Sequence, residues 1–465
     1  MQKLNKVIND ERETMMAQEA MSEGTVIRDL GDGLVLRHAT EADTEELAAF
    51  NGLVHRGPDT DEPDNSVIIW TRDLMRGNHP TFPVRDFLVV EDTQTGAIVS
   101  TTNLISQVWS YSGVPFKVGR PELVATHPDY RNRGLVRAQF EVLHRWSAER
   151  GELAQAITGI PYYYRQFGYE MTLALTTRRV GYLAHIPKLK EGEPEPYHVR
   201  PATGDDLPFI EELYNHAMKR YLVSALRDAA LWRYELDGRS HRSVEHKEIR
   251  IIATPEGEPV GFIMHNDTVW GPTLSVNLYE LKPGASWVAV TPSVLRYFEK
   301  VGKEYAEREK KADFGAFMLS LGDKHPVYDA IPSKLPRKPP GYTYFMRVPD
   351  MPAFLRHIAP VLEERLAASS LAGHTGEFKL NFYRSNVKLS FQDGRLTNAA
   401  PYTPSHQEDG DAFFPNLTFL HMLFGHLDLD DLTRVFPDCW FKGDEGRLAV
   451  TALFPRQDSF VLPIG

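Results

Sequence analysis

Residues 123–136 of the chain have the sequence LVATHPDYRNRGLV. A strand is expected to end near Thr126, and a helical pattern begins after Gly134. Backbone N–H groups at the start of a helix lack partners within it and carry a partial positive charge. A pyrophosphate fits such a loop, because the glycine permits close approach and because Arg131 and Arg133 supply charged donors. The segment therefore predicts a strand–loop–helix unit that binds a phosphate-bearing ligand.

The sequence around this segment predicts a mixed α/β unit. The segment itself lacks the GxGxxG spacing of dinucleotide-binding folds and the Gly-Lys-Ser/Thr of P-loop nucleotide triphosphatases, so neither class is favoured. Apolar runs predict strands before and after it, and one amphipathic helix lies between them. The expected strands are 87–90, 97–103, 115–126, 153–160 and 170–178, and the expected helix is 133–150.

Two short patterns recur in the same order along the chain and indicate an internal duplication. The first is RHATEAD, which returns as RPATGDD, and the second is a strand–turn–strand pattern. Asp43 and Asp206 are expected at helix starts, where a carboxylate meets free N–H groups. The matching ranges are 37–43 with 200–206, and 89–99 with 251–261.

Proline- and glycine-rich stretches divide the chain further. Residues 186–199 and 331–341 predict connectors, since such clusters continue neither a helix nor a central strand. The region from Met351 onwards is expected to be α+β, with its last strands at 447–454 and 459–464. A chain of 465 residues is long enough for about three domains.

Charge and composition narrow the classes of partner. Fifty-two Lys and Arg against 63 Asp and Glu give a formal net charge of −11, which disfavours nucleic acid and favours a cationic amine substrate. The single cysteine, Cys439, cannot form an internal disulfide, which is typical of the cytoplasm. We expect no signal peptide and no membrane span. The 17 histidines show no HExxH spacing, so no metal site is expected.

Three motifs carry a resemblance to a known family. RNRGLV at residues 131–136 resembles the R/Q-x-x-G-x-G/A acetyl-CoA signature of GNAT N-acetyltransferases. With Arg137-Ala138 after it, the motif resembles the variant found in the enhanced intracellular survival (Eis) type. YRQFGY at 164–169 resembles the tyrosine motif of that type, and FPDC at 436–439 resembles part of its C-terminal domain. The resemblance covers nearly the whole chain.

This resemblance implies two tandem GNAT-like mixed-sheet domains of the α/β class, followed by a sterol-carrier-like α+β domain. The implied divisions are an N-terminal polar extension at 1–26, a catalytic GNAT domain at 27–186, a degenerate second GNAT-like domain at 187–348 and the sterol-carrier-like domain at 349–465. The implied activity is acetyl-CoA-dependent N-acetylation, without a metal, of a primary amine on an aminoglycoside- or polyamine-like substrate. The implied assembly is a cytoplasmic homohexamer.

The same resemblance assigns the site residues. Tyr164 would protonate the departing CoA thiolate, and the terminal carboxylate of Gly465 would be the base. Main-chain atoms at the strand end would pair with the pantetheine amides of CoA, and the loop would cradle its pyrophosphate. The strand-end residues are Val124, Ala125 and Thr126, and the loop residues are Arg131, Asn132, Arg133, Gly134, Leu135, Val136 and Arg137.

Elementary chemistry leaves alternatives at both catalytic positions. A phenol, with a pKa of ~10, is a suitable acid for a thiolate whose thiol has a pKa of ~8.5. Tyr163 is the alternative to Tyr164 for this role. A terminal carboxyl group has a pKa of ~3.5 in water, so it needs burial to raise that pKa before it can act as a base. The apolar run at residues 460–462 favours such burial. Glu122, His127 and a water molecule are the other candidate bases.

Alternatives also remain for the function as a whole. One is a CoA- or lipid-binding module without turnover, and another is an acetyltransferase that acts on a protein or peptide. Residues 289–295 take the place of the phosphate loop in the second unit and lack its Arg-x-x-Gly pattern. We therefore expect the second unit to bind no CoA and to form one wall of the substrate pocket.

Overall fold

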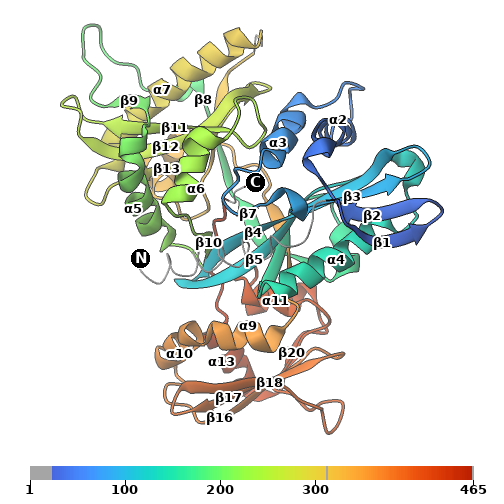
Figure 1. Cartoon of the computed structure of the whole chain (residues 1–465). Helices are drawn as coiled ribbons and strands as arrows, with labels where there is room; N and C mark the ends of the chain where they lie inside the picture. Colours follow the sequence, from blue (N-terminus) through green and yellow to red (C-terminus); the bar gives the residue numbers. More distant parts are fainter. Residues whose placement is uncertain (1–23, 311–312, 463–464) are drawn as a thin grey trace.

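The structure is a computed structural model and describes residues 24–310, 313–462 and 465. The expected polar extension at residues 1–26 therefore lies almost entirely outside the described residues. Three β-sheets with helices packed on them make up the described chain, which confirms the mixed α/β class. Figure 1 shows them as three lobes, with the third sheet below the other two. No described helix has both the length and the apolar character that crossing a bilayer requires.

The first sheet contains the predicted strand–loop–helix unit. Helices α2 (Thr44–Val54) and α3 (Asn65–Met75) cover one face, where Phe87 and Val89 point, and α4 (Leu135–Glu149) covers the other, where Leu88 and Val90 point. The strands, in order, are β1 (Val26–Gly31), β2 (Leu34–His38), β3 (Phe87–Asp92), β4 (Ala97–Tyr111), β5 (Val114–Thr126), β6 (Ala154–Ile157), β15 (Tyr342–Arg347) and β7 (Glu170–Thr176), with β10 (Val223–Ala225) paired to β4.

The second sheet repeats part of this plan. Its long helix α7 (Trp287–Arg308) follows β13 as α4 follows β5, and α5 (Leu207–Met218), α6 (Ala229–Arg233) and α8 (Val327–Ala330) complete the lobe. The strands, in order, are β8 (Arg178–Tyr182), β14 (Ala316–Ser320), β13 (Thr273–Leu281), β12 (Pro259–Trp270), β11 (Lys247–Ala253) and β9 (His198–Pro201).

The duplicated patterns adopt the same local structure in both lobes. The Arg37 guanidinium donates to the Asp43 carboxylate through two hydrogen bonds of 2.8 Å, and Arg200 binds Asp206 with the same two lengths. Both aspartates are N-cap residues, of α2 and α5, which confirms the expected helix starts. The strand–turn–strand patterns form β3–β4 and β11–β12, as expected.

The first two sheets exchange strands. The chain leaves β7 and enters β8 of the second sheet after a single residue, Thr177, and it later returns β15 to the first sheet between β6 and β7. The domain divisions at 27–186 and 187–348 therefore stay a prediction, since backbone pairing crosses them in both directions.

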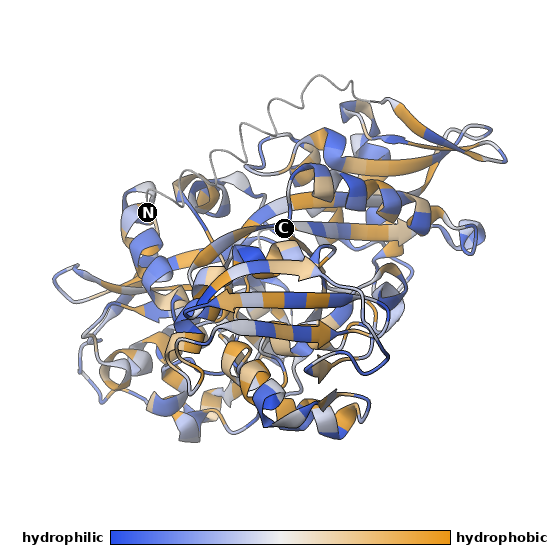
Figure 2. Cartoon of the chain, turned by 90° about the horizontal axis from the view of Figure 1, so that it is seen from below, coloured by the Kyte–Doolittle hydropathy of each residue, from blue (hydrophilic) through white to orange (hydrophobic). Residues whose placement is uncertain are grey.

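The third sheet carries the C-terminal region. Its strands, in order, are β18 (Arg395–Pro401), β17 (Asn386–Gln392), β16 (Gly376–Asn381), β19 (Ala412–Phe413) and β20 (Trp440–Phe441), and its helices are α9 (Met351–His357), α10 (Ala359–Ala367), α11 (Phe419–Leu423), α12 (Leu429–Val435) and α13 (Gly443–Leu453). Figure 2 shows hydrophobic and hydrophilic residues alternating along these strands, as in the buried-and-half-exposed pattern of β17.

Two expected strands at the end of the chain are wrong. Residues 447–454 lie mainly within α13, where the buried residues Gly446, Ala449, Val450 and Leu453 follow helical spacing. A short apolar run in a sequence is compatible with either a buried strand or a buried helix. The expected strand 459–464 is reduced, within the described residues, to one bridge between Phe460 and Ser224.

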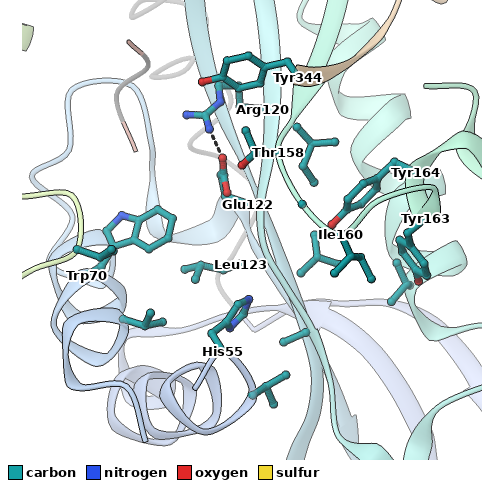
Figure 3. Close-up of a pocket in the computed structure, with 18 of the residues that line it drawn as sticks. His55, Trp70, Arg120, Glu122, Leu123, Thr158, Ile160, Tyr163, Tyr164 and Tyr344 are labelled. Carbon is teal, nitrogen blue, oxygen red and sulfur yellow. Dashed lines mark hydrogen bonds and ion pairs between the residues drawn. The ribbon is translucent and has the colours of Figure 1, made fainter. Parts of the chain in front are cut away.

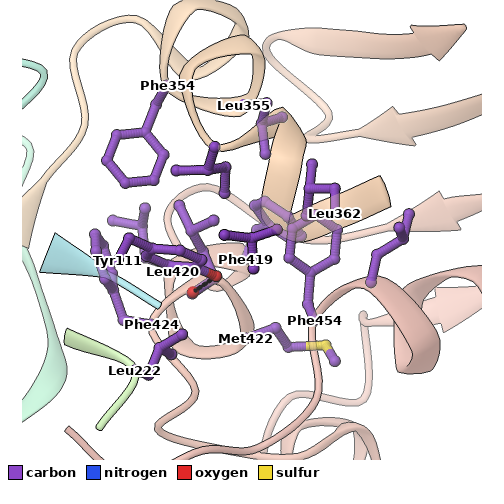
Figure 4. Close-up of a cluster of buried hydrophobic side chains, with 14 of the residues drawn as sticks. Tyr111, Leu222, Phe354, Leu355, Leu362, Phe419, Leu420, Met422, Phe424 and Phe454 are labelled. Atoms are coloured by element: carbon purple, nitrogen blue, oxygen red, sulfur yellow. Dashed lines mark hydrogen bonds between the residues drawn. The ribbon is translucent and has the colours of Figure 1, made fainter. Parts of the chain in front are cut away.

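One hydrophobic cluster joins the third lobe to the first sheet. Phe354 of α9 packs edge to face against Tyr111 of β4, Phe116 of β5 and Phe424, with ring centroids 5.4–6.0 Å apart. The Tyr111 hydroxyl also donates to the Leu423 carbonyl at 2.7 Å. Figure 4 shows the rings of Phe354, Tyr111 and Phe424 packed together with their hydrophobic neighbours, between the third lobe and the first sheet. The third lobe is therefore packed directly against β4, the longest strand of the first sheet.

We expect the Phe354→Ala substitution to lower the free energy of unfolding by about 3–5 kcal/mol, because it leaves a cavity at a fully buried aromatic ring. Urea unfolding followed by tryptophan fluorescence measures the change. Leu448→Ala in α13, whose side chain is 47% exposed, is the matched control and is expected to change stability by less than about 0.5 kcal/mol. Equal effects of the two substitutions would contradict the packing described.

Candidate active site

The end of β5 has an irregular backbone that opens toward β6. Thr101 pairs with Ala125 and Asn103 pairs with Glu122, so two residues of β5 lie opposite one residue of β4. This bulge contains Leu123, whose φ is +49°. Strands β5 and β6 pair only near Val118 and Gly119. Beyond that point the β6-facing backbone of β5 has no strand partner in the described part of the chain.

The loop after β5 ends in an open helix start. Gly134 is the N-cap of α4 with φ +78°, and no atom lies within 4 Å of the position that a Cβ would take there. Arg131, Asn132 and Arg133 are exposed on the loop beside it. Free N–H groups, open space and exposed guanidinium groups together form a site that fits a diphosphate.

A cavity of about 1300 Å³ connects this loop to the interior between the first two sheets. It is lined by all ten residues predicted to bind the cofactor, and by Tyr163, Tyr164 and Glu122. His127 and Gly465 are absent from the lining. The lining residues that were predicted are Val124, Ala125, Thr126, Arg131, Asn132, Arg133, Gly134, Leu135, Val136 and Arg137.

Tyr164 lies on the turn after β6, with its ring buried and its hydroxyl directed into the cavity (Figure 3). Only 5% of the residue is exposed, and its ring packs against Phe140 and Phe345 with centroids 5.8 and 5.4 Å apart. A Cβ on Gly159 would lie 2.5 Å from this ring, so the glycine makes room for it. Burial, together with the charge of Glu122, raises the pKa of Tyr164, and the hydroxyl stays protonated.

Glu122 is the carboxylate nearest to the bulge along the chain. Arg120, which lies 5.9 Å from the centroid of the Tyr344 ring, donates to it, as Figure 3 shows. The Glu122 side chain is 13% exposed. Burial raises the pKa of this carboxyl, the Arg120 charge opposes the shift, and the negative charge of Glu245 adds to it. A carboxylate in this environment is a stronger base than one in water.

Gly465 is held close to the cavity without lining it. Its carbonyl oxygen accepts a hydrogen bond of 2.7 Å from the buried guanidinium of Arg239. A Cβ on Gly465 would lie 3.0 Å from the Glu245 side chain and 3.2 Å from Trp70, both of which line the cavity. Phe460 is buried, as the apolar run at 460–462 predicted.

The second sheet supplies a polar wall that sequence motifs did not reveal. In β13 the alternate residues Leu274 and Val276 are buried against the helices, whereas Ser275 and Asn277 line the cavity. The only signal in the sequence was this alternation of polar and apolar residues. The other polar side chains of the wall and its edges are Arg178, Glu245, Lys247, Asn266 and Ser320.

One group of side chains has the composition of a metal site. His241, His246 and Asp267 offer ligand atoms within 4.8 Å of one another, and the His246 Nδ1 atom lies 3.0 Å from the Asp267 carboxylate. None of the three lines the cavity. The hydrogen bond already accounts for the His246–Asp267 pair, and the group contributes nothing to the candidate active site.

Comparisons with known proteins identify one domain and the fold. Residues 35–172 match the sequence model of the acetyltransferase (GNAT) domain. No curated protein matches the chain in sequence. Among solved structures, a GCN5-related N-acetyltransferase from Kribbella flavida superposes with a TM-score of 0.61 at 18% identity, over 93% of this chain and 98% of that one.

Two further structures share the fold at lower identity. A probable N-acyltransferase from Enterococcus faecalis has a TM-score of 0.64 at 12% identity, over 93% of this chain and 99% of that one. Eis1 from Mycobacterium abscessus has a TM-score of 0.54 at 12% identity, over 91% of this chain and 98% of that one. The likeness to the Eis type therefore holds for the fold, while the sterol-carrier-like nature of residues 349–465 stays a prediction. The chain carries a GNAT acetyltransferase domain at residues 35–172, within a fold that solved GNAT-related structures share over nearly their whole length.

Proposed function

We propose that the chain transfers an acetyl group from acetyl-CoA directly to the primary amine of a small molecule. The observation that carries this proposal is a single cavity that joins the open start of α4, the bulged end of β5 and the buried hydroxyl of Tyr164. A thiol-release assay with acetyl-CoA and a panel of amines tests it. The panel includes aminoglycosides, spermidine and lysine peptides, and no release with any amine would contradict the proposal.

The backbone around the bulge has two tasks in this reaction. The free edge of β5 offers N–H and C=O groups with which the pantetheine amides pair like an added strand. The bulge shifts the register with β4 at Leu123 and Val124, and the N–H groups there are the ones that we propose polarise the thioester carbonyl. The loop and the α4 N-terminus bind the diphosphate.

Tyr164 is the proposed acid. As the amine forms its bond to the carbonyl carbon, the carbon–sulfur bond breaks and the sulfur becomes a thiolate that needs a proton. The hydroxyl of Tyr164 donates that proton, because it points into the cavity and stays protonated until the thiolate forms; its raised pKa makes it a weaker acid than a phenol in water. Tyr163 also lines the cavity, but it is less buried than Tyr164.

Glu122 is the proposed base, which accepts the proton that the nitrogen of the neutral amine loses as it bonds to the carbonyl carbon. It shares the cavity with Tyr164, and its raised pKa suits it to this task. The terminal carboxylate of Gly465 is the alternative that family resemblance favours. The hydrogen bond from Arg239 to the Gly465 oxygen stabilises the charged form of such a carboxylate and so weakens it as a base.

Gly134→Val is expected to raise the KM for acetyl-CoA about tenfold, since a β-branched residue is strained at φ +78° and shifts the helix start that binds the diphosphate. Steady-state kinetics at saturating amine measure it. Gly151→Val at the other end of α4 is the matched control, because Gly151 has φ +69° and equally open surroundings. If both variants keep the wild-type KM, the phosphate loop has been assigned to the wrong residues.

The finer expectations from sequence remain proposals. A polycationic acceptor, a cytoplasmic location and a homohexameric assembly rest on resemblance and overall charge alone. The alternatives of a CoA- or lipid-binding module and of a protein acetyltransferase are decided by the same amine panel, since the first predicts no thiol release and the second predicts release only with peptides.

A further inference from the structure

The cavity contains a cationic side chain without a partner. Arg178 is the first residue of β8, at the point where the chain passes from the first sheet to the second, and it is half-buried in the cavity lining. Its guanidinium makes no hydrogen bond or ion pair within the described part of the chain, and its Nε atom is shielded from solvent. A shielded charged donor without a partner is costly in free energy, so this position favours the binding of an anion.

The neighbours of Arg178 suit the same kind of ligand. Ser320 of β14 lies directly opposite Arg178 in the β8–β14 pair, and both residues line the cavity. Asn277 follows the last paired residues of β13 and β14 and adds a side-chain amide to the lining. A guanidinium beside a hydroxyl and an amide is a set of donors that binds a carboxylate or a phosphate.

The carboxylates of the cavity lie on other elements. Glu122 is on β5, and Glu245 lies two residues before β11 begins at Lys247; β11 is four strand positions from β8 across the second sheet. At the usual spacing of neighbouring strands this separation is about 19 Å. Glu122 is already paired with Arg120, and the Lys247 ammonium donates to the carbonyls of Val244 and His246. Neither carboxylate therefore forms an ion pair with Arg178.

The diphosphate is not a natural partner for Arg178. Arg131 and Arg133 in the loop before α4, and Arg137 in its first turn, lie beside the first sheet, whereas Arg178 belongs to the second sheet. The second sheet forms the wall opposite the predicted cofactor site, which is the side left for the acceptor. The anion at Arg178 is therefore expected to belong to the acceptor.

We propose that the acceptor is an amine that also carries an anionic group, a carboxylate or a phosphate, and that Arg178, with Ser320 beside it, binds that group. This inference rests on the proposed function. It departs from the polycationic acceptor that the net charge of the whole chain favoured, because that charge says nothing about which side chains face the cavity.

The test compares acceptors that differ only at the end remote from the amine. Thiol release is measured with 6-aminohexanoate, 6-aminohexanol and hexane-1,6-diamine, and a shorter pair, phosphoethanolamine and ethanolamine, separates phosphate from carboxylate. We expect kcat/KM to be highest for an anionic member and lowest for the diamine. Arg178→Met is expected to lower kcat/KM for the anionic member about tenfold to a hundredfold, with the KM for acetyl-CoA unchanged.

Arg179→Met is the matched control, because Arg179 is the next residue of β8, stacks on the Tyr328 ring at 5.1 Å and does not line the cavity. It removes the same charge and is expected to keep the acceptor preference. The inference is overturned if the diamine is the best acceptor, if Arg178→Met leaves the order of acceptors unchanged, or if that variant instead raises the KM for acetyl-CoA. Absence of thiol release with every amine overturns the proposed function instead.

Discussion

The Tyr164→Phe variant is expected to lose at least about a hundredfold in kcat, because a positioned acid that protonates a leaving group contributes roughly this much or more. The substitution removes one oxygen atom from a ring that is otherwise held by Phe140 and Phe345, so the fold and the cavity are expected to persist. Steady-state kinetics give kcat, and calorimetric titration with CoA is expected to give an unchanged dissociation constant.

Tyr163→Phe provides the control for this result. Tyr163 is adjacent in sequence, also lines the cavity and is less buried than Tyr164, so its loss is expected to change kcat by less than about threefold. The opposite pattern, with a large loss for Tyr163→Phe and a small one for Tyr164→Phe, would transfer the acid role to Tyr163.

The second large effect is expected for Glu122→Gln, which keeps a hydrogen-bond acceptor for Arg120 but removes the base. We expect kcat/KM to fall about a hundredfold or more. In the wild type the base acts only when ionised, and burial raises its pKa, so activity is expected to fall as the pH drops through a value above the ordinary range of a glutamate. The variant is expected to lose this acid limb. A pH profile of kcat/KM measures both effects.

Glu245→Gln also tests whether Glu122 is the base, by changing the pKa of Glu122 and leaving that residue in place. The negative charge of Glu245 adds to the raised pKa of Glu122, so its removal is expected to move the acid limb to lower pH while the base remains. Full activity of Glu122→Gln, together with loss of activity when residues are added after Gly465, would assign the base to the Gly465 carboxylate. Thermal unfolding of each variant separates these outcomes from a loss of fold.

Local motifs explain what could be predicted. The ten residues predicted to bind the cofactor are nearly contiguous in the chain and line one cavity, because a strand–loop–helix unit places contiguous residues around one helix start whatever the rest of the fold does. The position of Tyr164 could be predicted for the same reason, since its turn directly follows a short buried strand. The helix starts at Asp43 and Asp206 depend on contacts within seven residues, namely the capping boxes with Thr40 and Thr203 and the hydrogen bonds from Arg37 and Arg200.

Long-range pairing explains what could not be predicted. Arg178 and Ser320 become neighbours only because β8 pairs with β14, and nothing within either segment specifies that pairing. The helix α13 was missed for a different reason, since LAVTALF at residues 448–454 is apolar enough for either a buried strand or a helix. The backbone hydrogen bonds of Leu222 with Asp458 and of Gln457 with Gly425 join segments far apart in the chain, and no local pattern specifies them.

The exchange of β8 and β15 between the first two sheets has a mechanical consequence. Rotation of the second sheet away from the first would strain the two covalent crossings, at Thr177 and before β15, and the pairing of β10 with β4. These connections limit how far the two walls can move apart, so we expect entry and exit of ligands to depend mainly on side chains and loops at the rim. The distance between the walls then limits the thickness of any acceptor that can enter the cavity.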